Sequence, residues 1–271
     1  MQIPLNNHPL IMGIINLTPD SFYSKAHNNN FDDIDSKYAD IIDVGCESSR
    51  PGAQPITEKN ELTRLTQFLN AEHLFPGMLS IDTYKPAVAR FALENGFNMI
   101  NDIKSGGDND MMLNLAAEYD CPIVLMHMKG VPATMQDNPF YNDIMSDIKY
   151  FFEKKLKKAE ALGINKKNLL LDPGIGFGKR LEDNNVILNN LNSLKQFDHP
   201  ILIGLSRKSF LSVNGDGPES RLSTTIGATV LAIQKGVDIL RVHDIEETYK
   251  LKIILQRISN LKSSKTDTIY N

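Results

Sequence analysis

The 271-residue chain has no tryptophan, only two cysteines and no long hydrophobic run. Two cysteines, Cys46 and Cys121, are too few for a disulfide framework, so reduced thiols and a cytoplasmic location are expected. The first twenty residues lack the basic start and the small-residue cleavage site of a secretory signal. Their apolar run, LIMGII, is far too short to cross a bilayer. A membrane partner is therefore not expected.

A basic excess is also missing. The formal net charge is -4, so the chain has no surplus of cations with which to neutralise nucleic-acid phosphates. A general nucleic-acid binder is not expected. Hydrophobic residues make up 41% and charged residues 23% of the chain, which are ordinary proportions for a globular protein. No Gly/Ser/Pro-rich linker interrupts the middle, and the length fits one large α/β barrel or two small domains.

Short apolar runs, each closed by polar residues, recur along the chain. They are LIMGIINLT, ADIIDVG, MLSIDT, NMINDI, PIVLMHM, LLLDPG, ILIGLSRK and ILRVHD. Near-continuous runs of this kind are typical of strands buried on both faces of a parallel sheet. Helical patterns lie between several of them, over 86–95, 142–163, 224–236 and 245–258. The alternation favours a single-domain (β/α)8 barrel over an open sheet, covering 1–271 with a polar tail from about residue 262.

Polar side chains stand at or just beyond every predicted strand end. In strand order they are Asn16, Asp43, Asp82, Asn101, His127, Asp172, Arg207 with Lys208, and Arg241 with His243. The carboxyl ends of all strands of a β/α barrel meet on one face, where active sites lie. A single aspartate at a strand end commonly caps a helix, but a polar group at all of these ends indicates a shared site. The four cations on the last two strands lie where such barrels usually bind phosphate.

Two loops have distinctive sequences. The glycines of DPGIGFGK are spaced GxGxG rather than GxGxxG, and no acidic strand end follows about twenty residues later, so a dinucleotide site is not expected. We expect this loop to bring backbone close to a flat ring. The segment after the first strand, SKAHNNNFDDIDSKY, has room for at most about two or three helical turns, and its asparagine run predicts a mobile polar loop.

From about Met12 to Glu247 the chain resembles the dihydropteroate synthases. The motifs that carry the resemblance occur in order, one per strand: MGIINLTPDSF, DVGCESSRPGA, SIDTYKP, INDI, LMHMKG, DPGIGFGK, GLSRKSF and RVHD. The family usually has GGESTRPGA, where this chain has Cys46 and Ser49 in place of a glycine and a threonine. Serine keeps the hydroxyl but loses the methyl group and the χ1 stiffness of threonine. The family's Gly-rich stretch after SF is replaced by YSKAHNNN, so the first loop is expected to close differently.

The resemblance implies an enzyme that condenses 6-hydroxymethyl-7,8-dihydropterin pyrophosphate with 4-aminobenzoate to give 7,8-dihydropteroate and pyrophosphate. It implies that the pterin is bound by Asp82, Asn101, Met126, Asp172, Phe177 and Lys208. The implied pyrophosphate ligands are Asn16, Ser49, Arg241 and His243. The implied 4-aminobenzoate ligands, shared with sulfonamides that mimic it, are Phe22, Ser49, Arg50, Pro51, Arg207 and Ser209. Lys208, Arg241, His243 and Asp82 are the expected catalytic group. The resemblance also implies a homodimer formed through the last helices.

The chemistry of these residue types agrees with the implied roles. A carboxylate such as Asp172 accepts a pair of ring N–H donors in strong, charge-assisted bonds. The guanidinium of Arg241 can bind two phosphate oxygens at once, and a helix N-terminus after Ser209 would favour a carboxylate. Mg2+ is expected to arrive with the pyrophosphate, because it binds adjacent phosphates and takes few protein ligands. Asn16 is the candidate metal ligand, through its amide oxygen.

We expect a dissociative substitution, in which pyrophosphate leaves first and the aromatic amine then attacks the resulting cation. A nucleophilic serine is not expected, since GLSRKS lacks the GxSxG pattern. One alternative is a pterin-binding barrel of the corrinoid-linked methyltransferase type, which would not need SRPGA or SRKSF. The other is a non-catalytic pterin-binding subunit, against which the presence of Asp172, Lys208 and Arg241 argues.

Overall fold

The computed structural model describes residues 3, 9–17, 36–48, 52–70, 75, 77–107 and 109–266, with the backbone alone at residue 36 and beyond residue 259. The strands are β1 (Leu10–Asn16), β2 (Ile41–Gly45), β3 (Met78–Asp82), β4 (Met99–Asp102), β5 (Ile123–Met126), β6 (Leu169–Asp172), β7 (Leu202–Gly204) and β8 (Ile239–Val242). The helices are α1 (Glu58–Asn70), α2 (Pro86–Glu94), α3 (Met111–Glu118), α4 (Ile144–Ala161), α5 (Leu181–Asn189), α6 (Leu222–Gln234) and α7 (Ile245–Thr266). Short 3₁₀ helices cover Ser36–Tyr38, Lys166–Asn168, Leu191–Phe197, Ser209–Leu211 and Pro218–Ser220.

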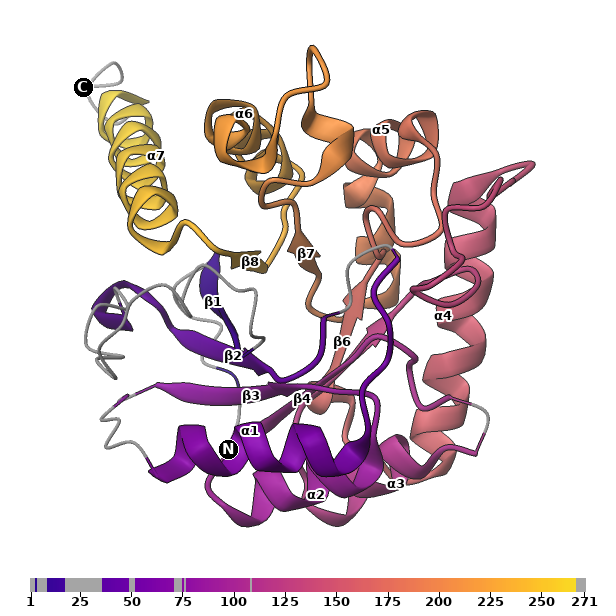
Figure 1. Cartoon of the computed structure of the whole chain (residues 1–271). Coiled ribbons are helices and arrows are strands. Elements are labelled where there is room, and N and C mark those ends of the chain that lie inside the picture. Colours follow the sequence, from indigo (N-terminus) through magenta and orange to yellow (C-terminus); the bar gives the residue numbers. More distant parts are fainter. Residues whose placement is uncertain are drawn as a thin grey trace.

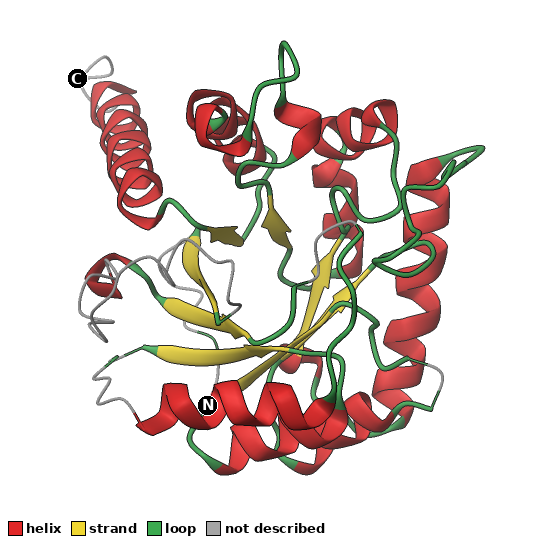
Figure 2. Ribbon diagram, in the orientation of Figure 1, coloured by secondary structure: helices red, strands yellow, loops and turns green. Residues whose placement is uncertain are grey.

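The strands form one parallel sheet in the order β6-β5-β4-β3-β2-β1-β8-β7, wrapped by the helices (Figures 1 and 2). The two end strands of this order approach each other through a parallel bridge between Leu171 and Ile201. The Leu171 N–H also donates to the Pro200 carbonyl oxygen at 2.9 Å. The sheet therefore closes on itself, and the predicted (β/α)8 barrel is confirmed.

The barrel interior changes from apolar to polar along the strands. A buried apolar layer fills its amino-terminal end and comprises Leu10, Met12, Ile41, Met78, Met99, Val124, Leu170, Leu202 and Ile239, with Ile3. Because side chains alternate between the two faces of a strand, residues two or four positions further on point into the same interior. Those positions hold Asp43, Asp82, Asn101, Asp172 and Arg241. The polar site is thus built directly on top of the apolar layer, at the carboxyl ends of the strands.

The outer faces of the strands pack against the apolar sides of the helices in a second, larger core that includes Ile42, Ile81, Leu125, Leu65 and Phe152. Helix α4 illustrates how the sequence specifies this packing. Asp143 caps it by accepting hydrogen bonds from the N–H groups of Met145 and Ser146, and its buried side recurs every three or four residues from Ile144 to Ala159. Lys155 of the same helix folds back and donates to the Ser105 carbonyl at 2.6 Å.

Element boundaries differ from the predictions at two places. The seventh strand, expected over 201–208, ends at Gly204, because the chain turns at Arg207, which has a positive φ of 56°. The last helix, expected to end at 258, continues to Thr266, so the predicted polar tail is helical over its first turn. Residues 259–266 contain no glycine or proline that would stop a helix. Most of the first crossover, residues 18–35, lies outside the described residues. Among the helices that are described, none combines the length and apolar character needed for a bilayer crossing.

Candidate active site

Arg241 of β8 lies at the centre of the polar barrel mouth and joins four strands. Its Nε donates to Asp43 Oδ2 at 2.6 Å, and its NH2 donates to Asp82 Oδ2 at 2.6 Å. Asp43 Oδ2 also accepts a hydrogen bond from Asn101 Nδ2 at 2.9 Å. Strands β2, β3, β4 and β8 therefore place their polar side chains within direct contact of one another, as predicted for the strand ends.

The electrostatics keep Arg241 charged in this buried position. Burial alone would lower the pKa of its guanidinium, but the carboxylates of Asp43 and Asp82 raise it above the usual arginine value. Burial raises the pKa of Asp82, and the guanidinium counteracts that effect. Among the described residues, the third guanidinium nitrogen of Arg241, NH1, has no hydrogen-bond partner. That nitrogen is the part of the cation that can bind an anion entering the mouth.

Gly45, at the end of β2, lies between two oxygen donors. A Cβ atom at this position would be 3.5 Å from Asn16 Oδ1 and 3.5 Å from Asp82 Oδ2. An amide oxygen and a carboxylate oxygen, the latter already accepting from Arg241 NH2, therefore both lie near Gly45. Two such donors suit a cation that keeps most of its water and takes few protein ligands, as Mg2+ does. A cluster of three or more His, Cys, Asp or Glu side chains that could hold a metal is absent from the described part of the chain.

On the opposite side of the mouth, Asp172 and Lys208 bring two opposite charges near an aromatic ring. Asp172 Oδ1 accepts the Gly174 N–H at 2.7 Å. Lys208 Nζ donates to the Ile175 carbonyl and lies 4.7 Å from the centre of the Phe177 ring. Burial lowers the pKa of Lys208 to about 8, and burial raises that of Asp172, while each charge partly offsets the effect on the other. Met126, at the end of β5, is buried and lies two positions after Val124 of the apolar layer, so it is on the same interior face.

The loop after β6 is held against the end of β5 by its glycines and by Lys179. A Cβ on Gly174, whose φ is 67°, would stand 2.0 Å from the His127 carbonyl oxygen, so only glycine fits. Lys179 Nζ donates to the carbonyls of His127 and Phe177, both at 3.0 Å. Burial lowers the pKa of Lys179 to about 7. These contacts fix the backbone from which Asp172 and Phe177 project.

His127 was expected among the converging strand-end side chains, but its ring points away from the mouth. The ring packs against Tyr141 and Phe151, with ring centres 6.0 and 5.2 Å away. Burial, with the nearby charges of Lys179 and Lys129, lowers the pKa of His127 to about 3, so the imidazole is neutral. Residue 127 follows interior-facing Met126 and therefore faces the helices, which makes the expectation for its side chain wrong.

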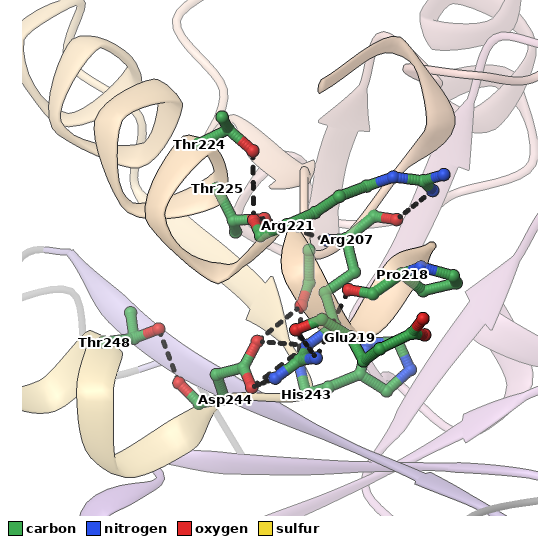
Figure 3. Close-up of polar contacts among 10 residues, drawn as sticks. Arg207, Pro218, Glu219, Arg221, Thr224, Thr225, His243, Asp244 and Thr248 are labelled. Atoms are coloured by element: carbon green, nitrogen blue, oxygen red, sulfur yellow. Dashed lines mark hydrogen bonds and ion pairs between the residues drawn. The ribbon is translucent and has the colours of Figure 1, made fainter. Parts of the chain in front are cut away.

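The turn after β7 and the end of β8 form the last quadrant of the mouth (Figure 3). The Arg207 guanidinium is directed at Asp244, with Nε 3.0 Å from Oδ2 and NH2 2.5 Å from Oδ1. The His243 N–H donates to Ser206 Oγ at 3.3 Å. Ser209 is exposed and begins a 3₁₀ helix of three residues, while the long helix α6 begins only at Leu222. The helix N-terminus predicted directly after Ser209 is therefore not a full helix.

Phe22, Ser49, Arg50 and Pro51 lie outside the described residues. Conversely, the sequence pattern marked Asp43 as a strand-end residue without giving it a ligand role, and it gave Lys179 no role. A charge inside the apolar run ADIIDVG was the available signal for Asp43.

Comparison with known proteins places the chain among enzymes of one kind. Residues 12–243 match the family described as pterin binding enzyme. The dihydropteroate synthase of Escherichia coli strain K12 is 39% identical over 268 residues, which cover 96% of this chain and 95% of that protein. The Haemophilus influenzae dihydropteroate synthase is 37% identical over 264 residues, covering 93% and 94%.

Solved structures agree with this comparison. A Yersinia pestis dihydropteroate synthase in a sulfonamide drug complex is 38% identical, covers 96% of this chain and 97% of its own, and superposes with a TM-score of 0.87. A Xanthomonas albilineans dihydropteroate synthase with 4-aminobenzoic acid is 35% identical, covers 94% of both chains and has a TM-score of 0.83.

Proposed function

The chain belongs to the dihydropteroate synthases, and on that premise we propose that it condenses 6-hydroxymethyl-7,8-dihydropterin pyrophosphate with 4-aminobenzoate, in folate biosynthesis. The observation that carries this proposal is the meeting of Asp82, Asn101 and Arg241 at one mouth of the barrel. Asp172 and Lys208 face the same mouth from β6 and the turn after β7. The carboxylates that can bind a heterocycle, Asp82 and Asp172, thus lie in the same mouth as Arg241, which can bind phosphate.

The pterin is assigned to the side of Asp172. Its carboxylate can accept the ring's adjacent N–H donors, while Asp82 and Asn101 serve the other heteroatoms. Phe177 is half-buried and Met126 is buried, so both are suited to contact the ring faces. The Lys208 ammonium, which lies beside Phe177, can donate to a ring acceptor. The site can therefore form hydrogen bonds to the polar edge of a flat ring and apolar contacts to its two faces.

The pyrophosphate is assigned to Arg241 and His243. The NH1 group of Arg241 has no hydrogen-bond partner among the described residues, and the guanidinium remains charged. Ser49 completes this set by family resemblance. Mg2+ bound to the two phosphates would supply charge neutralisation of the leaving group, and Asn16 would hold it through its amide oxygen. The remaining 4-aminobenzoate residues, Phe22, Arg50, Pro51 and Ser209, also rest on the resemblance.

The proposed reaction begins with breakage of the C–O bond between the pterin methylene carbon and pyrophosphate, whose oxygen keeps the bonding electrons. Arg241 stabilises that negative charge because it is already oriented and charged before the reaction starts. Asp82 and Asp172 stabilise the cation left on the pterin. The amine of 4-aminobenzoate then donates its lone pair to the methylene carbon, and one proton passes from the nitrogen to the departing pyrophosphate or to water. The barrel mouth supplies the alignment of both reactants.

We further propose a cytoplasmic homodimer. Both cysteines are buried free thiols, and burial raises the pKa of Cys46 to about 12, which suits a reducing compartment. Ile254 and Ile258 of α7 are 48% and 47% exposed and lie one helical turn apart, which gives the last helix an apolar stripe for a second copy. Sedimentation measurements and a subcellular fractionation test these two statements.

The function is tested by mixing the protein with the dihydropterin pyrophosphate, Mg2+ and labelled 4-aminobenzoate. The expected products are labelled dihydropteroate and an equal amount of pyrophosphate. A methyltransferase-type barrel or a non-catalytic subunit would bind the pterin and give neither product. Arg90→Ala is a matched control, because Arg90 lies in an exposed ion pair with Glu118 away from the mouth and its loss should leave turnover unchanged.

A further inference from the structure

Arg207 uses all three guanidinium nitrogens within the protein (Figure 3). Its Nε and NH2 form a two-pronged ion pair with the Asp244 carboxylate, and NH1 donates to the carbonyls of Pro218 and Glu219 at 3.3 and 3.2 Å. The hydrogen bonds that Arg207 donates to the Asp244 carboxylate raise the pKa of Arg207 further above its usual value. The side chain is 28% exposed and that of Asp244 12%, so the pair is partly shielded from water. A guanidinium engaged in this way has little capacity left for a substrate carboxylate.

The backbone of Arg207 is held as firmly as its side chain. Its φ of 56° lies in the left-handed region, which non-glycine residues adopt only when their surroundings hold them there. The Arg207 N–H donates to Thr225 Oγ1 at 3.0 Å, and the Arg207 carbonyl accepts from Arg221 NH1 at 3.1 Å. Thr225 Oγ1 in turn donates to the Arg221 carbonyl at 2.7 Å. The start of α6 thus fixes both peptide groups of the turn.

The ion pair links the two segments that carry cations of the active site. On one side, Arg207 directly precedes Lys208, whose ammonium lies over Phe177. On the other side, Asp244 directly follows His243 and opens α7, where Thr248 donates to the Asp244 carbonyl. Ser206 Oγ lies 3.4 Å from Asp244 Oδ2 and accepts the His243 N–H. The position of Lys208 relative to His243 therefore depends on this contact.

We propose that Arg207 and Asp244 are positioning residues, whose ion pair sets the places of Lys208 and His243 on the pterin pyrophosphate. The inference rests on the proposed function and replaces the direct 4-aminobenzoate contact expected for Arg207. A lysine at 207 would keep the charge but could not form the two-pronged contact. An asparagine at 244 would keep the shape but lose the charge. Each substitution therefore breaks the same link from a different end.

A double-mutant cycle of Arg207→Lys and Asp244→Asn tests the proposal. Each single variant should lower kcat/KM for the pterin pyrophosphate about tenfold, and the double variant should be no worse than the more impaired single, because both remove one shared interaction. The KM for 4-aminobenzoate should change less than about twofold, since neither residue contacts it. Glu118→Gln, which breaks the equally two-pronged but exposed pair with Arg90, should change none of these values.

The outcomes are distinguishable. A raised KM for 4-aminobenzoate in Arg207→Lys alone, with Asp244→Asn silent, would mean direct substrate contact and overturn the proposal. Multiplicative losses in the double variant would also overturn it. Failure of the proposed function would appear as a wild-type protein without product. In that case the same cycle is run on the affinity for inorganic pyrophosphate with Mg2+ by calorimetry, where a shared, non-additive loss is still required. Thermal melting of every variant identifies any that fail to fold.

Discussion

Replacing Asp43 by asparagine tests how the mouth of the barrel is built. The Asp43 side chain is 0% exposed, and its Oδ2 accepts from Arg241 Nε at 2.6 Å and from Asn101 Nδ2 at 2.9 Å. The asparagine oxygen can keep both contacts, but without the charge. Its NH2 group would then stand at the place of Oδ1, which has no hydrogen-bond partner among the described residues. The substitution thus removes one charge and adds one unsatisfied donor.

The cost follows from these contacts. Breaking a buried ion pair costs about 3–5 kcal/mol, and a hydrogen bond to a charged group contributes about 1.5–3 kcal/mol. Since the oxygen acceptor remains and Asp82 still pairs with Arg241, we expect a loss of about 2–3 kcal/mol in the free energy of unfolding. For a domain of this size that loss lowers the melting temperature by about 5–10 °C.

Circular dichroism melts of Asp43→Asn and of Glu118→Gln, at pH 7 and matched salt, measure this effect. Glu118 pairs with Arg90 at a similar distance but on the exposed surface, so its variant should melt like the wild type. A melting temperature of Asp43→Asn within about 1 °C of the wild type would refute the reasoning. It would mean that Asp82 alone holds the guanidinium.

Three further results are expected. Asp172→Asn replaces one acceptor oxygen by an amide donor that faces the ring N–H groups. Calorimetry should therefore show pterin binding weaker by about 2–4 kcal/mol. An unchanged affinity would mean that Asp172 is not in the pocket. Burial lowers the pKa of Lys208 to about 8, from 10.5, so kcat/KM should fall as the pH rises through about 8. Between about pH 8 and 10.5, Lys208 is protonated in the unfolded chain but largely neutral in the folded one. The free energy of unfolding should therefore rise with pH in this range while kcat/KM falls. A fall or a rise of both quantities together would contradict this. The Gly174→Ala variant should have a melting temperature well below that of Gly163→Ala. Both glycines have a positive φ, but only a Cβ on Gly174 would clash, 2.0 Å from the His127 carbonyl oxygen. Equal melting temperatures would argue against that clash.

Much of the barrel could be predicted because its strands are buried on both faces. The continuous apolar runs predicted the number and order of the strands. Because side chains alternate between the two faces of a strand, Asp82, Asn101, Asp172 and Arg241 lie on the interior face above the apolar layer. The same period also explains the wrong expectation for His127. His127 is one position beyond interior-facing Met126 and therefore faces outward. The alternation of side chains along each strand would have separated it from the other strand-end residues.

Other features depend on contacts that no local pattern carries. The end of β7 is set by the turn at Arg207, whose positive φ is maintained by Thr225 and Arg221, fourteen or more positions along the chain. The pairing of Arg207 with Asp244 likewise joins residues that are distant in sequence. The motif predicted that Arg207 is near the site, but the direction of its side chain follows from the turn. The loops that carry Phe22 and Ser49 to Pro51 lie outside the described residues, so their assigned contacts stay predictions.

The central claim is that one barrel mouth has a pterin side at Asp172 and a pyrophosphate side at Arg241. The measurement that tests it most directly is a pair of calorimetric titrations of wild type and Arg241→Ala, one with the pterin pyrophosphate and Mg2+, the other with the same pterin without phosphates. Arg241→Ala should bind the first ligand far more weakly than the wild type does, and the second almost as well. Comparable losses for both ligands would contradict the division of the site.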